Sequence, residues 1–155
     1  LQLIGLAGPR WLTDTMWAMP ALLIMNTWRT SGYTMVIFLA GLTGIPREYY
    51  EAAEIAGAGR IQKFFNITLP LLSPTTFFLV VTSLLSAFQV FDQVAVMTQG
   101  GPVTATKVIN YAIYTEAFVS FRAGYAAAIA TVLFIILLIL TIIQLRLSRR
   151  WVHYQ

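Results

Sequence analysis

The chain alternates between long apolar stretches and shorter polar ones. The residues from Ala123 to Leu145 carry no charge, and neither do those from Phe64 to Phe91. A third apolar stretch runs from about Met16 to Thr43 and is interrupted by Arg29. Because a helix needs about 20 mainly apolar residues to cross the hydrocarbon core of a bilayer, this pattern predicts an all-α integral membrane protein. We expect about three membrane-spanning helices, at residues 16–43, 73–97 and 123–146.

Composition supports this class of protein. Of the 155 residues, 58% are hydrophobic and 10% are charged, whereas soluble domains carry about 25% charged residues. The net charge of +4 does not indicate nucleic-acid binding, because the Lys and Arg residues gather at the ends of apolar stretches. The chain has no cysteine, and its one histidine, His153, is near the C-terminus. We therefore predict no metal site.

The basic residues beside the apolar stretches predict the orientation in the membrane. Six lie in the 44–70 loop and the C-terminal tail: Arg47, Arg60, Lys63, Arg146, Arg149 and Arg150. Three lie on the other side: Arg10, Lys107 and Arg122. Cytoplasmic segments carry the excess of Lys and Arg, so we expect the 44–70 loop and the tail in the cytoplasm.

The 44–70 loop has the signals of two short helices. Pro46 suits the first position of a helix, and the pair Gly57 and Gly59 suits its end, which predicts a helix over Pro46–Ala56. Ile61, Phe64 and Phe65 then recur with helical spacing. We expect a cytoplasmic helix–turn–helix.

The charge pattern alone allows two interpretations of this loop. Its acidic residues suit a solvated connector between two spans. Its alanines also leave room for a partner surface, and Glu51 offers a charge that a partner Arg or Lys can hold.

The loop carries a long motif. Glu51-Ala52-Ala53 is followed by Gly57 and then by Ile67-Thr68-Leu69-Pro70, in the pattern EAA-x3-G-x9-I-x-LP. This resembles the signature loop of the membrane subunits of binding-protein-dependent ABC importers. The resemblance implies that the loop docks into a groove of an ATPase subunit, through Glu51, Ala52, Ala53, Gly57, Ile67, Leu69 and Pro70. The loop differs from the family pattern at Ala56, where the family usually has an acidic residue. The absence of this acid is expected to weaken local capping of the helix.

A second motif narrows the resemblance. Phe91-Asp92, Thr98 and Gly100-Gly101-Pro102 fit the pattern FD-x5-T-x-GGP, which is similar to a signature of carbohydrate-uptake permeases of the maltose and glycerol-phosphate type. The resemblance implies that residues 1–155 are the C-terminal part of a permease domain in the bacterial inner membrane. It also implies a second permease subunit, two ATP-binding subunits, an extracytoplasmic solute-binding protein and a sugar-like solute.

Polar residues within the spans are candidates for a solute path. In the second span Thr82, Ser86, Gln89 and Gln93 follow one helical stripe, with Ser83 beside it. In the first span Arg29 and Tyr33 share a face. The stripe and the resemblance together select five path residues: Arg29, Tyr33, Ser83, Ser86 and Gln89. The alternative is that the serines only pack helices together and that Arg29 pairs with an acid on a partner.

The motifs predict a transport subunit rather than an enzyme. No GxxxxGK[ST] phosphate loop occurs in the chain, so we expect no cofactor on it, with ATP and Mg bound by the partner ATPase. The alternative function is a secondary transporter or channel fragment that works without ATP. That alternative predicts acidic relays in the membrane, yet only Asp92 lies near a span.

Overall fold

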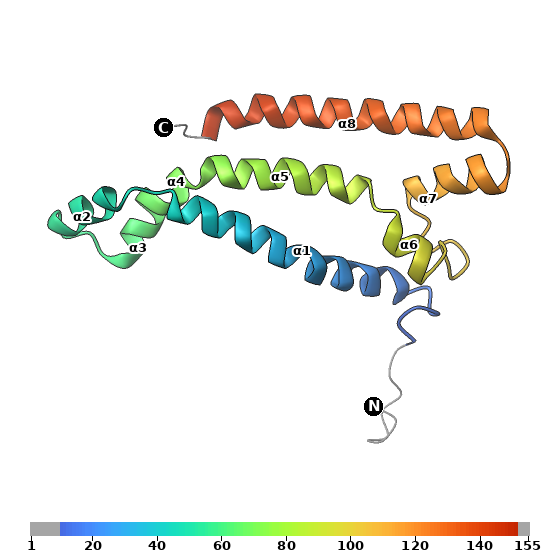
Figure 1. Ribbon diagram of the computed structural model, residues 1–155, viewed down its shortest axis with the longest axis horizontal. Helices are drawn as coiled ribbons and strands as arrows, with labels where there is room; N and C mark the ends of the chain where they lie inside the picture. The colour runs from blue at the N-terminus through green and yellow to red at the C-terminus, as the bar shows by residue number, and fades with distance from the viewer. Residues whose placement is uncertain (1–9, 152–155) are drawn as a thin grey trace, which may run out of the picture. The chain divides into compact units, whose positions relative to one another are not determined.

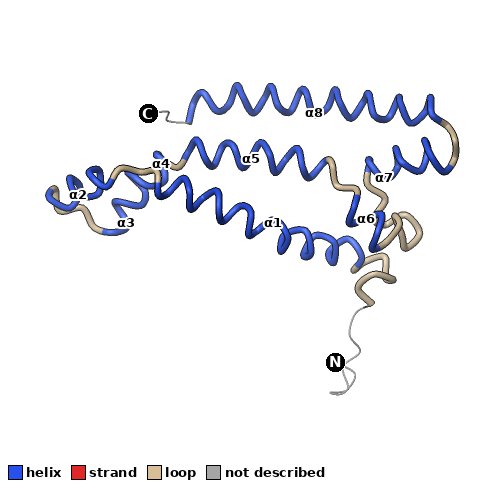
Figure 2. The backbone as a smooth tube through the Cα atoms, viewed as in Figure 1, coloured by secondary structure: helices blue, strands red, loops and turns tan. Residues whose placement is uncertain are grey.

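The computed structural model describes residues 10–151, which form helices joined by turns and loops, with no strand among them (Figures 1 and 2). The predicted all-α fold class is confirmed. The α-helices are α1 (Ala18–Thr43), α2 (Arg47–Ile55), α3 (Arg60–Lys63), α4 (Leu69–Leu71), α5 (Ser73–Phe88), α6 (Asp92–Met97), α7 (Ile109–Tyr114) and α8 (Ala123–Trp151). Two π-helical turns occur, η2 (Phe64–Thr68) and η3 (Thr115–Val119).

The chain packs as two compact units. One contains the residues up to Arg29 together with Leu85–Leu137, and the other contains Thr30–Leu84 together with the residues from Leu138 onward. Each unit is described by itself below.

Two segments of the described chain are long and apolar enough to cross a membrane. They are Ser73–Met97, with 25 residues, and Ala123–Ser148, with 26 residues. In their most apolar windows only 17% and 11% of the residues are buried, whereas the core helix of a soluble protein would be mostly buried. These exposed apolar surfaces suit lipid or other membrane helices.

Helix α1 is long enough to span a membrane, with 26 residues, but it is less apolar than the other two segments. Its middle is polar and includes Asn26, Arg29 and Ser31. A spanning role for α1 therefore stays a prediction.

The second apolar segment is not one continuous helix. Helix α5 ends at Phe88, Gln89 lies in a turn, and α6 begins at Asp92 after Phe91 adopts φ −138° and ψ −57°. The predicted polar stripe assumes one continuous helix, so it does not extend across the break to Gln93. Gln93 is only 5% exposed, and its side-chain amide donates to Asn26 Oδ1 at 3.1 Å.

The segment after α6 is a tightly bonded turn. Thr106 is fully buried; its hydroxyl donates to the carbonyl of Gly101 at 2.7 Å and lies 2.7 Å from the Thr98 hydroxyl. Gly100 adopts φ +79°, and a Cβ there would lie 2.8 Å from the ring of Tyr111. The Gly-Gly-Pro signature thus follows the end of α6 and leads the chain towards α7, a helix that the sequence does not predict.

Helix α2 begins one residue later than predicted, because Pro46 is its N-cap, with ψ 135°, rather than its first helical residue. Its C-terminal end is a Schellman motif. The Gly57 N–H donates to the Glu54 carbonyl and the Ala58 N–H donates to the Ala53 carbonyl, both at 2.9 Å. Gly57 adopts φ +77°, a conformation that costs an L-residue about 1–2 kcal/mol.

The chain then returns through α3, η2 and α4, which we call the second arm (residues 60–71). The sequence predicts one short amphipathic helix here, and the structure adds the π-helical turn η2 (Phe64–Thr68). Pro70 lies two residues after the end of this turn. Because proline lacks an N–H and its ring crowds the carbonyl four residues earlier, a wider turn before it relieves the clash.

Within the second unit, α1 approaches α5 closely at Gly41. A methyl group built on Gly41 would lie 2.6 Å from Thr75 Oγ1 and 3.2 Å from Thr75 Cβ. Thr75 is β-branched and stiff at χ1, so its side chain has little freedom to move away. Small residues allow such close helix contacts in membrane proteins.

We predict that Gly41→Ala destabilises the protein by about 1–3 kcal/mol, as expected for overpacking. Gly32→Ala on the same helix is the matched control, because a Cβ there meets nothing within 4 Å; it is expected to be neutral or to stabilise by about 0.5–1 kcal/mol. Denaturant unfolding in detergent micelles measures both. Equal stabilities of the two variants would contradict the close contact.

We also predict that Gly57→Ala loosens the end of α2. The strain of the left-handed conformation, about 1–2 kcal/mol, raises amide hydrogen exchange at residues 57 and 58 roughly tenfold. Gly59→Ala is the control, because Gly59 has φ −72° and open space around it. Unchanged exchange in Gly57→Ala would show that the turn adopts another conformation.

Candidate functional site

The predicted docking residues of the loop lie on two elements. Glu51, Ala52 and Ala53 are on α2, which has no buried residue. The Glu51 side chain is 62% exposed and pairs with Arg47 on the preceding turn at 3.4 Å. An exposed pair of this kind contributes only about 0.3–0.5 kcal/mol, so Glu51 can exchange Arg47 for a cation on another protein.

The other predicted docking residues are less uniformly accessible. Gly57 is exposed in the turn after α2, and Leu69 is 46% exposed on α4. Ile67 and Pro70 are half-buried. The structure thus places the Glu-Ala-Ala end of the motif on an open helix and the Ile-x-Leu-Pro end within the second arm, next to α5. Their docking role stays a prediction.

Two side-chain contacts that the sequence analysis missed join α2 to the second arm. Lys63 Nζ donates to Glu54 Oε1 at 2.7 Å, and the hydroxyls of Tyr50 and Thr68 lie 2.9 Å apart. The Lys63 side chain lowers the pKa of the Glu54 carboxyl, first through this hydrogen bond and then through charge attraction. The available signal was the four-residue spacing of Tyr50 and Glu54, which puts both on one side of α2.

Ala56, where the family usually has an acid, is the C-cap of α2. Its N–H donates to the carbonyl of Ala52 at 3.1 Å. The Schellman bonds of Gly57 and Ala58 are made by backbone atoms, so the end of the helix is satisfied without an acidic side chain at this position.

The predicted path residues are exposed on separate segments. Arg29 and Tyr33 are exposed on α1, Ser83 and Ser86 are exposed on α5, and Gln89 is exposed in the turn after α5. Arg29, Ser86 and Gln89 belong to the same compact unit, but no hydrogen bond or ion pair joins them within the described part of the chain. The role of the five residues as a path stays a prediction.

One polar contact in this unit joins Asn26 to Gln93. It connects α1 to α6 just beyond the helix break, and Gln93 is buried. Gln93 is part of the polar stripe predicted from the sequence, whereas Asn26 is not among the predicted residues. A polar residue inside an otherwise apolar run was the signal that could have found it.

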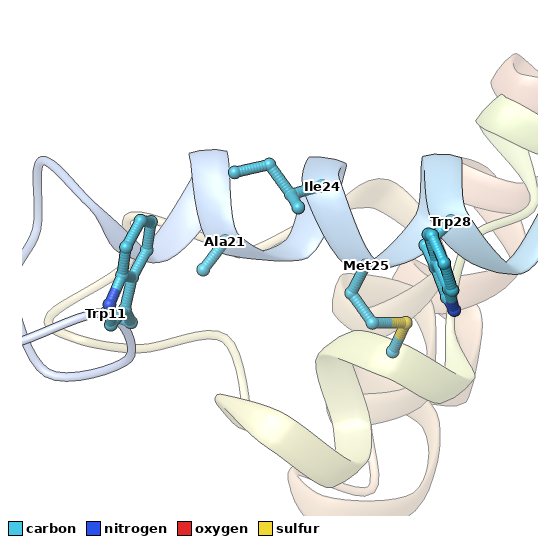
Figure 3. A pocket seen from close by; sticks show the side chains of 5 residues that line it. All are labelled: Trp11, Ala21, Ile24, Met25 and Trp28. Atoms are coloured by element: carbon cyan, nitrogen blue, oxygen red, sulfur yellow. The ribbon is translucent and has the colours of Figure 1, made fainter.

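An open pocket of about 410 Å³ lies against the first half of α1 (Figure 3). Trp11, held edge-to-face against Trp17, forms one end, and the rest is lined by Ala21, Ile24, Met25 and Trp28. Apart from the indole N–H groups of Trp11 and Trp28, the lining side chains are apolar and suit apolar material. Among the described residues, no group of three or more His, Asp or Glu side chains is placed to hold a metal ion.

Comparison with protein families gives a match over residues 1–153 to the family described as "Binding-protein-dependent transport system inner membrane component". One relative is the probable ABC transporter permease protein YesP of Bacillus subtilis, 40% identical over 147 residues, covering 94% of this chain and 47% of the relative. Another is the sn-glycerol-3-phosphate transport system permease protein UgpA of Pectobacterium atrosepticum, 39% identical, covering 98% and 52%. A third is the sulfoquinovosyl glycerol transport system permease protein SmoG of Agrobacterium fabrum, 38% identical, covering 96% and 48%.

The chain also resembles a solved structure, a bacterial ABC transporter involved in the import of the acidic polysaccharide alginate. The TM-score is 0.85 at 29% identity, and the match covers 97% of this chain and 53% of the other. A second structure of the alginate transporter, in complex with an alginate pentasaccharide-bound periplasmic protein, matches equally well, with a TM-score of 0.85.

This chain spans about half the length of the curated relatives it matches. The resemblance inferred from the two motifs is confirmed, since the matched family and the named relatives are transport permeases. The chain belongs to the family of inner membrane components of binding-protein-dependent transport systems.

Proposed function

We propose that this chain is the C-terminal, membrane-spanning part of a permease subunit in an ATP-driven importer of a sugar or sugar-like solute. It crosses the inner membrane several times, forms part of the solute path and docks an ATPase through the loop that contains α2. The observation that carries this proposal is the exposed helix α2, which presents the Glu51-Ala52-Ala53 motif and is followed by a membrane-length segment.

Energy for transport comes from other subunits in this proposal. The chain has no phosphate-binding loop of the GxxxxGK[ST] type, so ATP and Mg bind to two partner ATPase subunits. A second permease completes the membrane part. A solute-binding protein delivers the solute from outside, as supported by the periplasmic protein in the related alginate transporter complex.

The solute class follows from the relatives and from Arg29. Relatives are named for sn-glycerol-3-phosphate and for sulfoquinovosyl glycerol. Arg29 is an exposed cation in the polar middle of α1, and a guanidinium binds anionic oxygens well. A sugar or polyol that carries a negative charge is therefore the solute we favour.

The docking role of Glu51 is tested by Glu51→Lys, with Glu48→Lys as the matched control on the same helix. We expect Glu51→Lys to weaken ATPase binding about 30-fold or more, the loss of roughly 2 kcal/mol expected when a charge pair between proteins is broken. Uptake falls with it, while membrane insertion is unchanged. Co-purification of the ATPase and uptake into proteoliposomes measure the two effects.

The control variant Glu48→Lys makes the same change of charge at a different position on α2. Glu48 is exposed in the first turn of α2 and lies outside the motif, so Glu48→Lys is expected to keep both properties. Normal ATPase binding by Glu51→Lys would contradict the docking role.

The path role of Arg29 is tested with Arg29→Gln and the charge-conserving Arg29→Lys. The probe is the solute that raises the melting temperature of the cognate binding protein. If this solute is anionic, we expect Arg29→Gln to lower uptake about tenfold or more, since a hydrogen bond to a charged group contributes about 1.5–3 kcal/mol. Arg29→Lys keeps the charge and is expected to retain most of the uptake. Ser86→Ala is measured in parallel for a smaller loss; unchanged uptake in all three assembled variants would assign these residues to packing.

A further inference from the structure

The two contacts between α2 and the second arm are placed at different levels of the loop. The ion pair of Glu54 with Lys63 is near the turn at Gly57, and the contact of Tyr50 with Thr68 is one helical turn further from it on α2. Two separate contacts restrict the angle between two segments, whereas a single contact lets the segments rotate about it.

The π-helical turn η2 is what brings the second arm into register with α2. Tyr50 and Glu54 are four residues apart and share a side of α2, but Lys63 and Thr68 are five apart. In a regular α-helix of 3.6 residues per turn, such residues point about 140° away from each other. The wider i→i+5 turn of η2 brings them one above the other, and the Thr68 hydroxyl lies 3.5 Å from the carbonyl of Lys63.

The side chains of α2 differ in how far they are exposed. Tyr50 and its partner Thr68 are half-buried, and the Lys63 side chain is 17% exposed. The side chains of Glu54 and Glu51 are 64% and 62% exposed. Helix α2 thus contacts the second arm through Tyr50 and Glu54, while Glu51 beside them stays accessible.

The second arm is firmly joined to α5. Only Leu72 separates α4 from α5, and its N–H donates to the Thr68 carbonyl at 2.9 Å. The Ser73 hydroxyl donates to the Pro70 carbonyl at 2.6 Å, and both Leu72 and Ser73 are buried. A displacement of the second arm therefore moves the start of α5.

We infer that the Glu54–Lys63 and Tyr50–Thr68 contacts are a brace that holds α2 at a fixed angle to the second arm, so that force applied to α2 at Glu51 reaches α5. This role rests on the proposed function, but the fixed angle does not. Without the brace, α2 keeps its covalent links through the segments around Gly44 and Gly57–Gly59 but loses both polar contacts with the second arm, so docking and helix movement become uncoupled.

The fixed angle is tested on the full chain in lipid nanodiscs by pulsed EPR distances between spin labels. The chain has no cysteine, so the labelled pair Glu48→Cys and Asn66→Cys, both at exposed positions, has no background. Each contact is removed in turn, by Glu54→Gln or by Tyr50→Phe. We expect the ratio of molecules with α2 held against the second arm to molecules with α2 displaced from it to fall about two- to fivefold, the size typical of an exposed ion pair. The combined variant broadens the distance distribution further.

Arg47→Gln is the matched control, because it removes an ion pair within α2 only. Its distance distribution is expected to equal that of the unaltered loop. Identical distributions in the Glu54→Gln, Tyr50→Phe and combined variants would overturn the brace.

The transmission of force is tested in the assembled transporter with Glu54→Lys, Lys63→Glu and the charge-swapped double variant. We expect the single variants to keep ATPase co-purification, since Glu51 is untouched, but to import less solute per ATP hydrolysed. The swap restores the ion pair and the ratio. Normal ratios in the single variants would overturn the transmission role even if the loop loosens.

Failure of the proposed function is a different outcome. If the unaltered transporter shows no solute-stimulated ATP hydrolysis, the proposed importer is wrong, and the transmission role falls with it. The EPR distances then still decide whether the brace fixes the angle of α2.

Discussion

The constraint on which the structure depends is that hydrocarbon offers no hydrogen-bonding partner to the backbone. A segment that crosses a bilayer must satisfy its own N–H and C=O groups, so it is helical. In this chain both membrane-length segments consist mainly of helix, and the one interruption, between Phe88 and Asp92, has local partners. The Gln89 N–H donates to the carbonyls of Leu85 and Ser86, and the buried Gln93 beyond the break bonds to Asn26.

The same constraint explains why the loop between α1 and α5 has a different character. Outside the hydrocarbon, water can satisfy side chains on an open helix, so α2 has no buried residue and still ends in a complete Schellman motif. Its ties to the second arm are an ion pair and a hydroxyl contact rather than an apolar core. Contacts of this kind are individually weak but directional, which suits a segment that must keep an angle while Glu51 remains accessible to a partner.

Polar groups in this protein therefore fall into two kinds. Some are satisfied inside the chain, such as the buried Thr106 at the Gly-Gly-Pro turn and the pair of Asn26 with Gln93. Others are exposed, such as Arg29 and Glu51. In the proposed importer the first kind holds the frame, and the second kind meets a solute or another subunit.

The sequence by itself determined the all-α membrane class, the helix–turn–helix loop and the family, because hydropathy, glycine and proline signals and a long motif act locally along the chain. Only the tertiary structure decided which polar groups meet. The break after Phe88 removed Gln93 from the predicted stripe, and the π-helical turn aligned Lys63 and Thr68 with Glu54 and Tyr50. The physical reason is that residue spacing predicts neighbours only on a regular helix, and both features depart from 3.6 residues per turn.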